Sequence, residues 1–274
     1  MSIHTLLSLP KELHTHPAGL PLYLKGKEVA VLLIHGYTGI TDELSFFARR
    51  LNEAGFTVAL PRLPGHGTSG ADFLSTRAED WYRKVLDTYC DLKGQFPTVH
   101  WVGLSMGALL AILGRSQFHS GKLVLAAPAL QVFDRRLILT PLLRLFVRRM
   151  QKKEYRFEGP PEYAPIADSY WRYDWPGQAA ELYRLQRLAR QRLSLLSGNI
   201  LVLLGGKDDT VPPTVLDEIR KKAFHCTVDS LTFPESGHVV LNDVEREQVA
   251  DAVIRWLSEP VSYTHLTLPT IYSV

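Results

Sequence analysis

Short apolar runs of strand length alternate along the chain with segments in which apolar residues recur every three or four positions. Apolar runs without a polar face indicate buried strands of a parallel sheet, and the wider spacing indicates amphipathic helices. Residues 44–51, 81–89 and 249–256 show the helical spacing. The alternation predicts an α/β fold with a mostly parallel central sheet and helices on both faces. The predicted strands are residues 29–35, 56–60, 99–103, 122–127, 200–205 and 229–233.

The alternation breaks in one long segment, residues 131–198, between the fourth and fifth predicted strands. This segment begins with LILTPLLRLFVRRM, continues with a proline-rich stretch and ends in a helical pattern. An insertion placed between two core strands is a candidate cap over an active site. We therefore divide the chain into a core, residues 1–130 and 199–260, and a helical cap insertion, residues 131–198.

One serine lies in a Gly-x-Ser-x-Gly pattern, from Gly103 to Gly107, between a predicted strand and an Ala/Leu-rich helix. A sharp strand-to-helix turn of this kind exposes the serine oxygen at the carboxyl edge of the sheet, and the glycines permit close backbone packing. The N-terminus of the following helix also stabilises negative charge that develops nearby. Ser105 is therefore the candidate nucleophile.

The segment HGYTG, residues 35–39, follows the first strong strand. Its His-Gly pair allows the backbone to turn back beneath the serine. We expect the backbone N–H groups of Tyr37 and Met106 to point at the oxyanion of a tetrahedral intermediate. The loss of one such donor typically costs about 3–4 kcal/mol of transition-state stabilisation.

One histidine is distinguished by its position. His238 lies in the loop PESGH, after the last predicted strand and just before the final helix. His66, in LPGHG, also follows a strand, but its glycine-rich surroundings indicate a residue that structures its own loop. His238 is therefore the candidate general base.

The carboxylate that orients such a histidine is expected in a loop after a strand, between the serine and the histidine in the chain. The segment GGKDDTVPP fits this position and offers two aspartates. The pattern Asp-x-x-Val-Pro favours Asp208, while Asp209 and Asp134 remain as alternatives. The carboxylate would hold the imidazole in the correct tautomer and stabilise its charged form.

Composition limits the partners. The net charge of +3 over 274 residues is small, and no basic run is interleaved with aromatic residues, so we expect no nucleic-acid binding. Cys90 and Cys226 lie far apart and are predicted to be free thiols. The N-terminal segment lacks the features of a signal peptide, and no apolar run reaches ~18 residues. We therefore expect a cytoplasmic protein without stable membrane insertion.

The end of the chain, residues 261–274, reads VSYTHLTLPTIYSV. Its first ten residues correspond to a translated DNA sequence that resembles a transposase adaptor used in sequencing libraries. We predict that this tail is non-native read-through from a fragmentary environmental gene of metagenomic origin. It is excluded from the fold prediction.

Five motifs occur in order along the chain: LLIHGYTG, LPGHG, GLSMG, GGKDDTVPP and ESGHVV. Together they resemble the α/β-hydrolase superfamily, and more narrowly its small bacterial carboxylesterases and monoacylglycerol lipases, over residues 20–258. The resemblance implies Ser105 as nucleophile, Asp208 as acid and His238 as base, in the chain order of that fold. It also implies that the two backbone N–H groups named above serve the oxyanion and that the insertion forms the cap.

The cap holds the candidate substrate-binding residues. Leu142 and Phe146 belong to a strongly apolar stretch, residues 137–147, and Tyr170 and Trp171 belong to an aromatic-rich part that could line an acyl or alcohol pocket. Four basic residues follow the apolar stretch closely. This pattern fits an amphipathic lid that contacts a lipid interface transiently, or a helix that packs its apolar side on the core.

These residues predict acyl transfer on a small-molecule ester. Ser105 attacks the carbonyl, an acyl-enzyme forms, and water hydrolyses it with His238 as base, so no metal or organic cofactor is needed. We expect esters of short to medium acyl chains, monoacylglycerols among them. A thioesterase or an amidase would use the same residues, and the triad also fits a cofactor-free haloperoxidase side activity. A non-catalytic ligand receptor can keep the triad as well.

Overall fold

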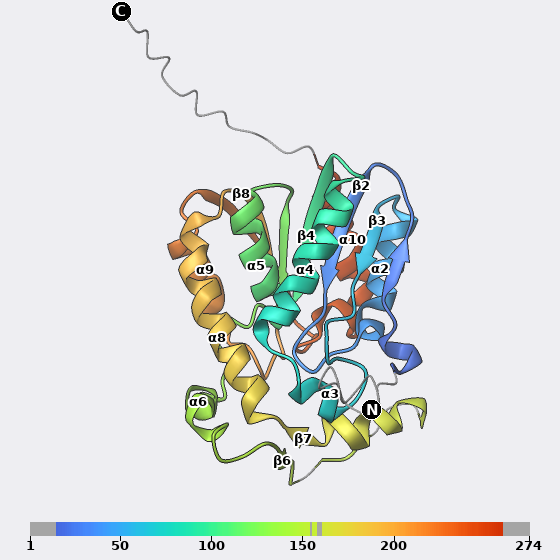
Figure 1. The fold of residues 1–274 in the computed structure, drawn as a ribbon. Coiled ribbons are helices and arrows are strands. Elements are labelled where there is room, and N and C mark those ends of the chain that lie inside the picture. The colour runs from blue at the N-terminus through green and yellow to red at the C-terminus, as the bar shows by residue number, and fades with distance from the viewer. Residues whose placement is uncertain (1–14, 154, 158–160, 260–274) are drawn as a thin grey trace, which may run out of the picture.

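The computed structural model describes residues 15–153, 155–157 and 161–259 (Figure 1). The tail predicted at residues 261–274 lies outside the described residues, as do residues 1–14 of the predicted core. The described residues contain one large sheet, helices on both of its faces, and a group of short elements beyond one end of the sheet (Figure 1).

The large sheet has seven strands in the order β1-β3-β2-β4-β5-β8-β9, and every neighbouring pair except β1–β3 is parallel. The prediction of a mostly parallel sheet is therefore confirmed, and the ends of the six predicted strands differ from the observed ends by at most three residues. The short edge strand β1 was not predicted, because its three residues are partly exposed and carry no long apolar run. The strands are β1 (Leu22–Leu24), β2 (Val29–Ile34), β3 (Thr57–Leu60), β4 (Thr98–Leu104), β5 (Leu123–Ala126), β8 (Gly198–Gly205) and β9 (Cys226–Phe233).

The core lies on both faces of this sheet because successive side chains of a strand point to opposite faces. In β2, Leu32 and Ile34 belong to the core cluster that also contains residues of α4, α5, α8 and α9, whereas Val31 and Leu33 belong to the cluster that contains residues of α2 and α10. All four side chains are fully buried, which explains why the strand reads as one continuous apolar run. The helices are α2 (Ser45–Glu53), α3 (Gly70–Leu74), α4 (Ala78–Lys93), α5 (Met106–Phe118), α8 (Pro176–Arg192), α9 (Val215–Lys222) and α10 (Arg246–Ser258), besides the short helices of the insertion given below.

The predicted insertion contains more than helices. Its first part forms short helical turns and a two-stranded antiparallel sheet, β6–β7, beyond the end of the large sheet (Figure 1). Its last part is the long helix α8, which buries Leu185 and Ala189 in the core. Within the described ranges, no helix has both the length and the apolar character that a bilayer-spanning segment requires. The short elements are η3 (Arg135–Leu139), α6 (Thr140–Leu143), β6 (Met150–Gln151), η4 (Pro161–Tyr163), α7 (Ala164–Ile166), η5 (Ala167–Trp171), β7 (Tyr173–Asp174) and η6 (Leu193–Leu195).

Two glycines allow β2, β4 and α5 to approach one another closely. A Cβ added at Gly107, in the first turn of α5, would lie 2.1 Å from the carbonyl oxygen of Ile34 at the end of β2. A Cβ added at Gly103, in β4, would lie 2.3 Å from the carbonyl oxygen of Gly107. Both contacts are with backbone, which cannot move aside as a flexible side chain can. The serine between these glycines therefore depends on the absence of both side chains.

We predict that Gly107→Ala lowers the free energy of unfolding by about 2–4 kcal/mol, because the added methyl group forces apart packed backbone. Gly177→Ala is the matched control, since a Cβ at this position in the first turn of α8 meets nothing within 4 Å. The control variant should be as stable as the parent or more stable by up to about 1 kcal/mol. Urea unfolding followed by circular dichroism measures both values. Equal stability of the two variants would contradict this account of the packing.

Candidate active site

Ser105 occupies the turn between β4 and α5, where the sequence pattern predicted it. Its backbone has φ 57° and ψ −113°, a positive φ that residues other than glycine seldom adopt. The Ser105 N–H donates to the carbonyl of Ala126 at 2.9 Å, and the Ser105 carbonyl accepts from Ala108 N–H at 3.1 Å. These hydrogen bonds tie the strained residue to β5 on one side and to α5 on the other. The turn thus presents the hydroxyl at the carboxyl edge of the sheet.

Three side chains from separate loops form a linear hydrogen-bonded series. His238 Nε2 lies 2.9 Å from Ser105 Oγ. His238 Nδ1 lies 3.0 Å and 3.1 Å from the two carboxylate oxygens of Asp208. Asp208 follows β8 and His238 follows β9, so both loops leave the same edge of the sheet as the serine turn. The structure therefore brings together the serine, histidine and aspartate that the sequence pattern selected.

The environment of Asp208 keeps the carboxylate ionised and fixed in place. One carboxylate oxygen accepts the backbone N–H groups of Thr210 at 2.8 Å and Val211 at 2.9 Å. Burial alone would raise the pKa of Asp208, but the hydrogen bonds from His238 and from backbone N–H groups outweigh it, and the pKa lies below its ordinary value. The side chain is only 4% exposed. An anion in this position favours a proton on the facing Nδ1 of the histidine.

The two alternative aspartates lie elsewhere. Asp209 is exposed, and its carboxylate accepts the hydroxyl of Thr210. Asp134 forms a two-pronged ion pair with Arg136 at the surface. Among the described residues, neither of them forms a hydrogen bond with His238, so the structure favours Asp208, as the Asp-x-x-Val-Pro pattern did.

The HGYTG loop lies directly against the serine. A Cβ added at Gly36 would be 3.4 Å from Ser105 Cβ and 3.9 Å from its Oγ, so this part of the loop lies within van der Waals reach of the serine side chain. Tyr37 follows in the chain, and within the described part of the molecule its N–H meets no acceptor. Met106 is the first residue of α5, where a backbone N–H has no partner inside the helix. The two expected oxyanion donors are thus both available at this edge of the sheet.

His35 holds the start of this loop, a role that the sequence pattern did not reveal. Its Nε2 accepts the backbone N–H of Leu63 at 3.1 Å, which places the ring proton on Nδ1, and Nδ1 lies 3.1 Å from the carbonyl of Gly36. Burial lowers the pKa of His35 to about 4, so the ring stays neutral near pH 7. A histidine that directly follows an apolar strand and precedes a glycine is the sequence signal that could have identified this role.

His66 structures its own loop, as the glycine-rich surroundings indicated. Its Nδ1 lies 3.0 Å from the carbonyl of Pro64, and its buried ring makes edge contacts with Phe73 and Trp81. Burial holds the pKa of His66 well below its ordinary value, so this ring is also neutral. No hydrogen bond joins His66 to the serine in the described part of the chain.

The four predicted cap residues lie in three different environments. Leu142 and Phe146 are 64% and 80% exposed, so the alternative in which the apolar stretch packs on the core is wrong for these two side chains. Tyr170 is 1% exposed and packs against other aromatic rings. Trp171 is half-buried, and its indole N–H donates to the carbonyl of Thr38 in the HGYTG loop. Trp171 is the one of these four for which the structure shows a hydrogen bond to that loop, and substrate binding by the four stays a prediction.

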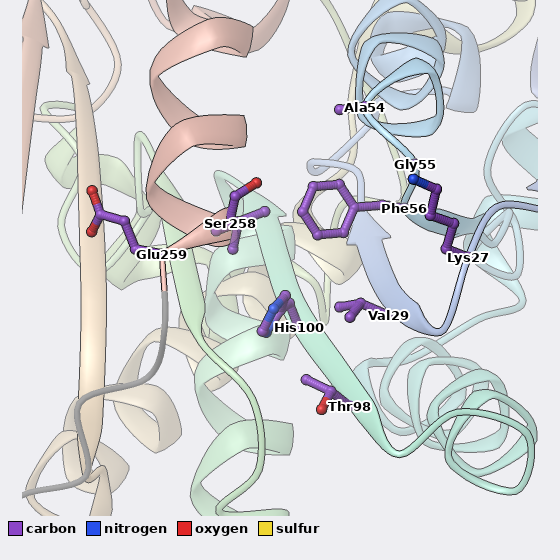
Figure 2. Close-up of a pocket in the computed structure, with 10 residues that line it drawn as sticks. Lys27, Val29, Ala54, Gly55, Phe56, Thr98, His100, Ser258 and Glu259 are labelled. Atoms are coloured by element: carbon purple, nitrogen blue, oxygen red, sulfur yellow. The ribbon is translucent and has the colours of Figure 1, made fainter.

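A cavity of about 350 Å³ lies at the opposite edge of the sheet (Figure 2). Val29 and Thr98, which line it, are the first residues of β2 and β4, whereas the serine turn follows the end of β4. His100 also lines the cavity, and burial lowers its pKa to about 4. Its Nδ1 accepts the backbone N–H of Lys122 at 3.0 Å. This cavity is therefore distinct from the serine site.

The sequence is similar to a family of known proteins and to individual members of known activity. A family model described as "Alpha/beta hydrolase family" matches residues 31–252. A carboxylesterase of Bacillus subtilis (strain 168) is 26% identical over 244 residues, which cover 87% of this chain and 86% of the relative. A thermostable monoacylglycerol lipase of Bacillus sp. (strain H-257) is 41% identical over 92 residues, 34% of this chain and 37% of the relative.

Solved structures show the same architecture. One comes from work on LipS and LipT, described as two metagenome-derived lipolytic enzymes. It superimposes with a TM-score of 0.80 at 24% identity and covers 89% of this chain and 99% of its own. A monoacylglycerol lipase of Paleococcus ferrophilus has a TM-score of 0.68 at 18% identity, with 86% and 97% covered. At these identities the likeness shows the fold alone.

Proposed function

The chain belongs to the alpha/beta hydrolase family, and on that premise we propose that it is a serine carboxylic-ester hydrolase that works through an acyl-enzyme. One observation carries the proposal: the unbroken hydrogen-bonded series from Ser105 Oγ through His238 to the buried Asp208. The similarity to a carboxylesterase over most of both chains supports the ester as the substrate class.

The geometry supports acylation in two steps. As Ser105 Oγ bonds to the ester carbonyl carbon, its proton moves to His238 Nε2, and the carbonyl π electrons move to the oxygen. The N–H groups of Tyr37 and Met106 would donate to this oxyanion. When the oxyanion collapses, the bond to the alcohol oxygen breaks and the alcohol leaves with the proton from His238. The products are a free alcohol and an ester of Ser105.

Deacylation repeats these steps with water. His238 removes a proton from water as the water oxygen attacks the acyl carbon, and then returns a proton to Ser105 Oγ as the acyl group leaves as a carboxylic acid. Asp208 stabilises the charged imidazole in both halves. Because its pKa lies below its ordinary value, Asp208 is ionised near pH 7.

Substrates of short to medium acyl chain, monoacylglycerols among them, fit the apolar character of the cap. The segment similar to a monoacylglycerol lipase supports this class, although it covers only a third of the chain. The same triad could attack a thioester or an amide, because the oxyanion chemistry is shared. These alternatives differ from the ester in the leaving group alone, so they are tested with matched acyl chains.

We also propose transient contact of the cap with a lipid surface. Large apolar side chains protrude from the cap between η3 and β6, and basic residues follow them. Exposed apolar groups next to cations are typical of a segment that lies on an anionic lipid surface. The cytoplasmic location expected from the sequence stays a prediction. The exposed apolar residues are Ile138, Leu139, Leu142, Leu145, Phe146 and Met150.

The first prediction on activity concerns the substrate. We expect p-nitrophenyl butyrate and decanoate to be hydrolysed faster than long-chain esters, and Ser105→Ala to lower kcat/KM by a factor of about 10³ or more. Thioester and anilide substrates with the same acyl groups should react more slowly. A parent chain that binds these esters tightly without turning them over would favour a receptor instead.

The proposed lipid contact is tested with monoacylglycerol below and above the concentration at which it aggregates. If the cap contacts lipid, the rate of hydrolysis should be higher above that concentration.

The second prediction separates the two adjacent aspartates. Asp208→Asn should lower kcat by about 10³–10⁴-fold, because an amide cannot hold His238 in the tautomer that accepts the serine proton. Asp209→Asn is the matched control and should stay within about threefold of the parent, since its carboxylate is exposed and contacts Thr210. Steady-state kinetics on p-nitrophenyl butyrate measures both effects. A larger loss in the Asp209 variant would overturn the assignment of the acid.

A further inference from the structure

The loop that carries the proposed oxyanion donor Tyr37 contains a strained residue. Gly36 and Gly39 close a turn, in which the N–H of Gly39 donates to the carbonyl of Gly36 at 3.2 Å. Thr38, inside this turn, has φ 56°, a left-handed value that a β-branched residue rarely adopts. Such a conformation persists only where neighbouring contacts hold it. The contacts of Thr38 therefore bear on the position of the adjacent Tyr37 N–H.

Two hydrogen bonds hold Thr38. Its own hydroxyl donates to the carbonyl of Tyr37 at 2.7 Å. The indole Nε1–H of Trp171 donates to the carbonyl of Thr38 at 2.9 Å. The second bond comes from 133 residues further along the chain and crosses from the cap to the core. A side chain of the cap thus helps to hold a turn at the edge of the sheet.

Two features of the cap orient the indole of Trp171. Trp171 is the last residue of η5 (Ala167–Trp171), a π-helical turn. Single π-helical turns change the direction of the side chains that follow and often occur at functional sites. The ring of Trp171 also contacts the ring of Tyr163, with centroids 6.4 Å apart. The orientation of the indole is therefore fixed from two sides, by η5 and by the neighbouring ring.

Two further contacts join the cap to the same loop on either side of Thr38. The hydroxyl of Tyr37 donates to the carbonyl of Trp175 at 3.3 Å. The hydroxyl of Tyr163 donates to the carboxylate of Asp42 just beyond the loop. The Trp171 bond is the one of these three that acts on the backbone of the strained residue.

We propose that Trp171 is a positioning residue, which fixes the strained Thr38 and thereby holds the Tyr37 N–H where the oxyanion forms. The inference rests on the proposed ester hydrolysis. An oxyanion donor acts chiefly in the transition state, where the charge develops. Loss of the indole N–H therefore lowers kcat and leaves KM nearly unchanged. A residue that lined the acyl pocket would instead change KM and the preferred chain length.

The test compares two tryptophan-to-phenylalanine variants. Trp171→Phe removes the bond to the Thr38 carbonyl, and Trp256→Phe removes an indole bond of 2.8 Å outside the cap, from α10 to the carboxylate of Asp229 in β9. Trp171→Phe should lower kcat about tenfold, with KM within twofold of the parent. Trp256→Phe should keep both kcat and KM within about twofold of the parent, because its indole bonds to β9 and not to the HGYTG loop.

A second readout reports on the oxyanion directly. A trifluoromethyl ketone forms a tetrahedral adduct with the serine that resembles the transition state. Its inhibition constant should therefore rise in Trp171→Phe by the same factor by which kcat falls. Trp171→Leu also lacks the indole N–H donor and should show the same fall in kcat as Trp171→Phe. It replaces Trp171→Phe in the test if the phenylalanine variant is unstable.

Three results would overturn the inference while leaving ester hydrolysis intact. They are an unchanged kcat in Trp171→Phe, a changed KM or chain-length preference in that variant, and an equal loss of kcat in Trp256→Phe. Failure of the parent chain to hydrolyse any ester is a different result, because it contradicts the proposed function and not the role of Trp171.

Discussion

The backbone turn at Ser105 is the constraint on which the rest of the molecule depends. A serine with φ 57° is strained, and it is held by hydrogen bonds to β5 and α5 and by two glycines that let three backbones meet. A side chain on either glycine would collide with backbone and remove the room for this turn. The strained conformation persists because the apolar side chains buried on both faces of the sheet stabilise the surrounding fold.

The parallel order of the strands delivers the other groups to the same place. The loops after β2, β8 and β9 leave the carboxyl edge of the sheet beside the serine, so residues far apart in the chain meet within hydrogen-bonding distance. Hydrogen bonds from His238 and from backbone N–H groups keep Asp208 ionised, and burial keeps His35 neutral where the HGYTG loop begins. The cap also restrains the HGYTG loop, because the indole of Trp171 is hydrogen-bonded to the carbonyl of Thr38.

Much of the core could be predicted from the sequence, because buried parallel strands read as continuous apolar runs and the serine turn demands glycines. The choice of Asp208 over its neighbour also followed from a local pattern. The cap could not be predicted in the same way. Its short turns and small sheet have no sustained period, and exposed apolar side chains such as Phe146 look like core residues in a sequence. The bond from Trp171 to Thr38 joins distant residues through a backbone carbonyl, which no side-chain pattern reveals.

The central claim is that Ser105 is the nucleophile, and covalent labelling tests it most directly. The folded parent chain would be treated with a fluorophosphonate probe, digested and mapped by mass spectrometry, beside the Ser105→Ala chain. The account predicts one phosphonate per molecule, on the peptide that contains Ser105, and no label on the variant, because only a serine activated by His238 reacts readily with such a probe. Label on another residue, or none on a folded parent chain, would contradict it.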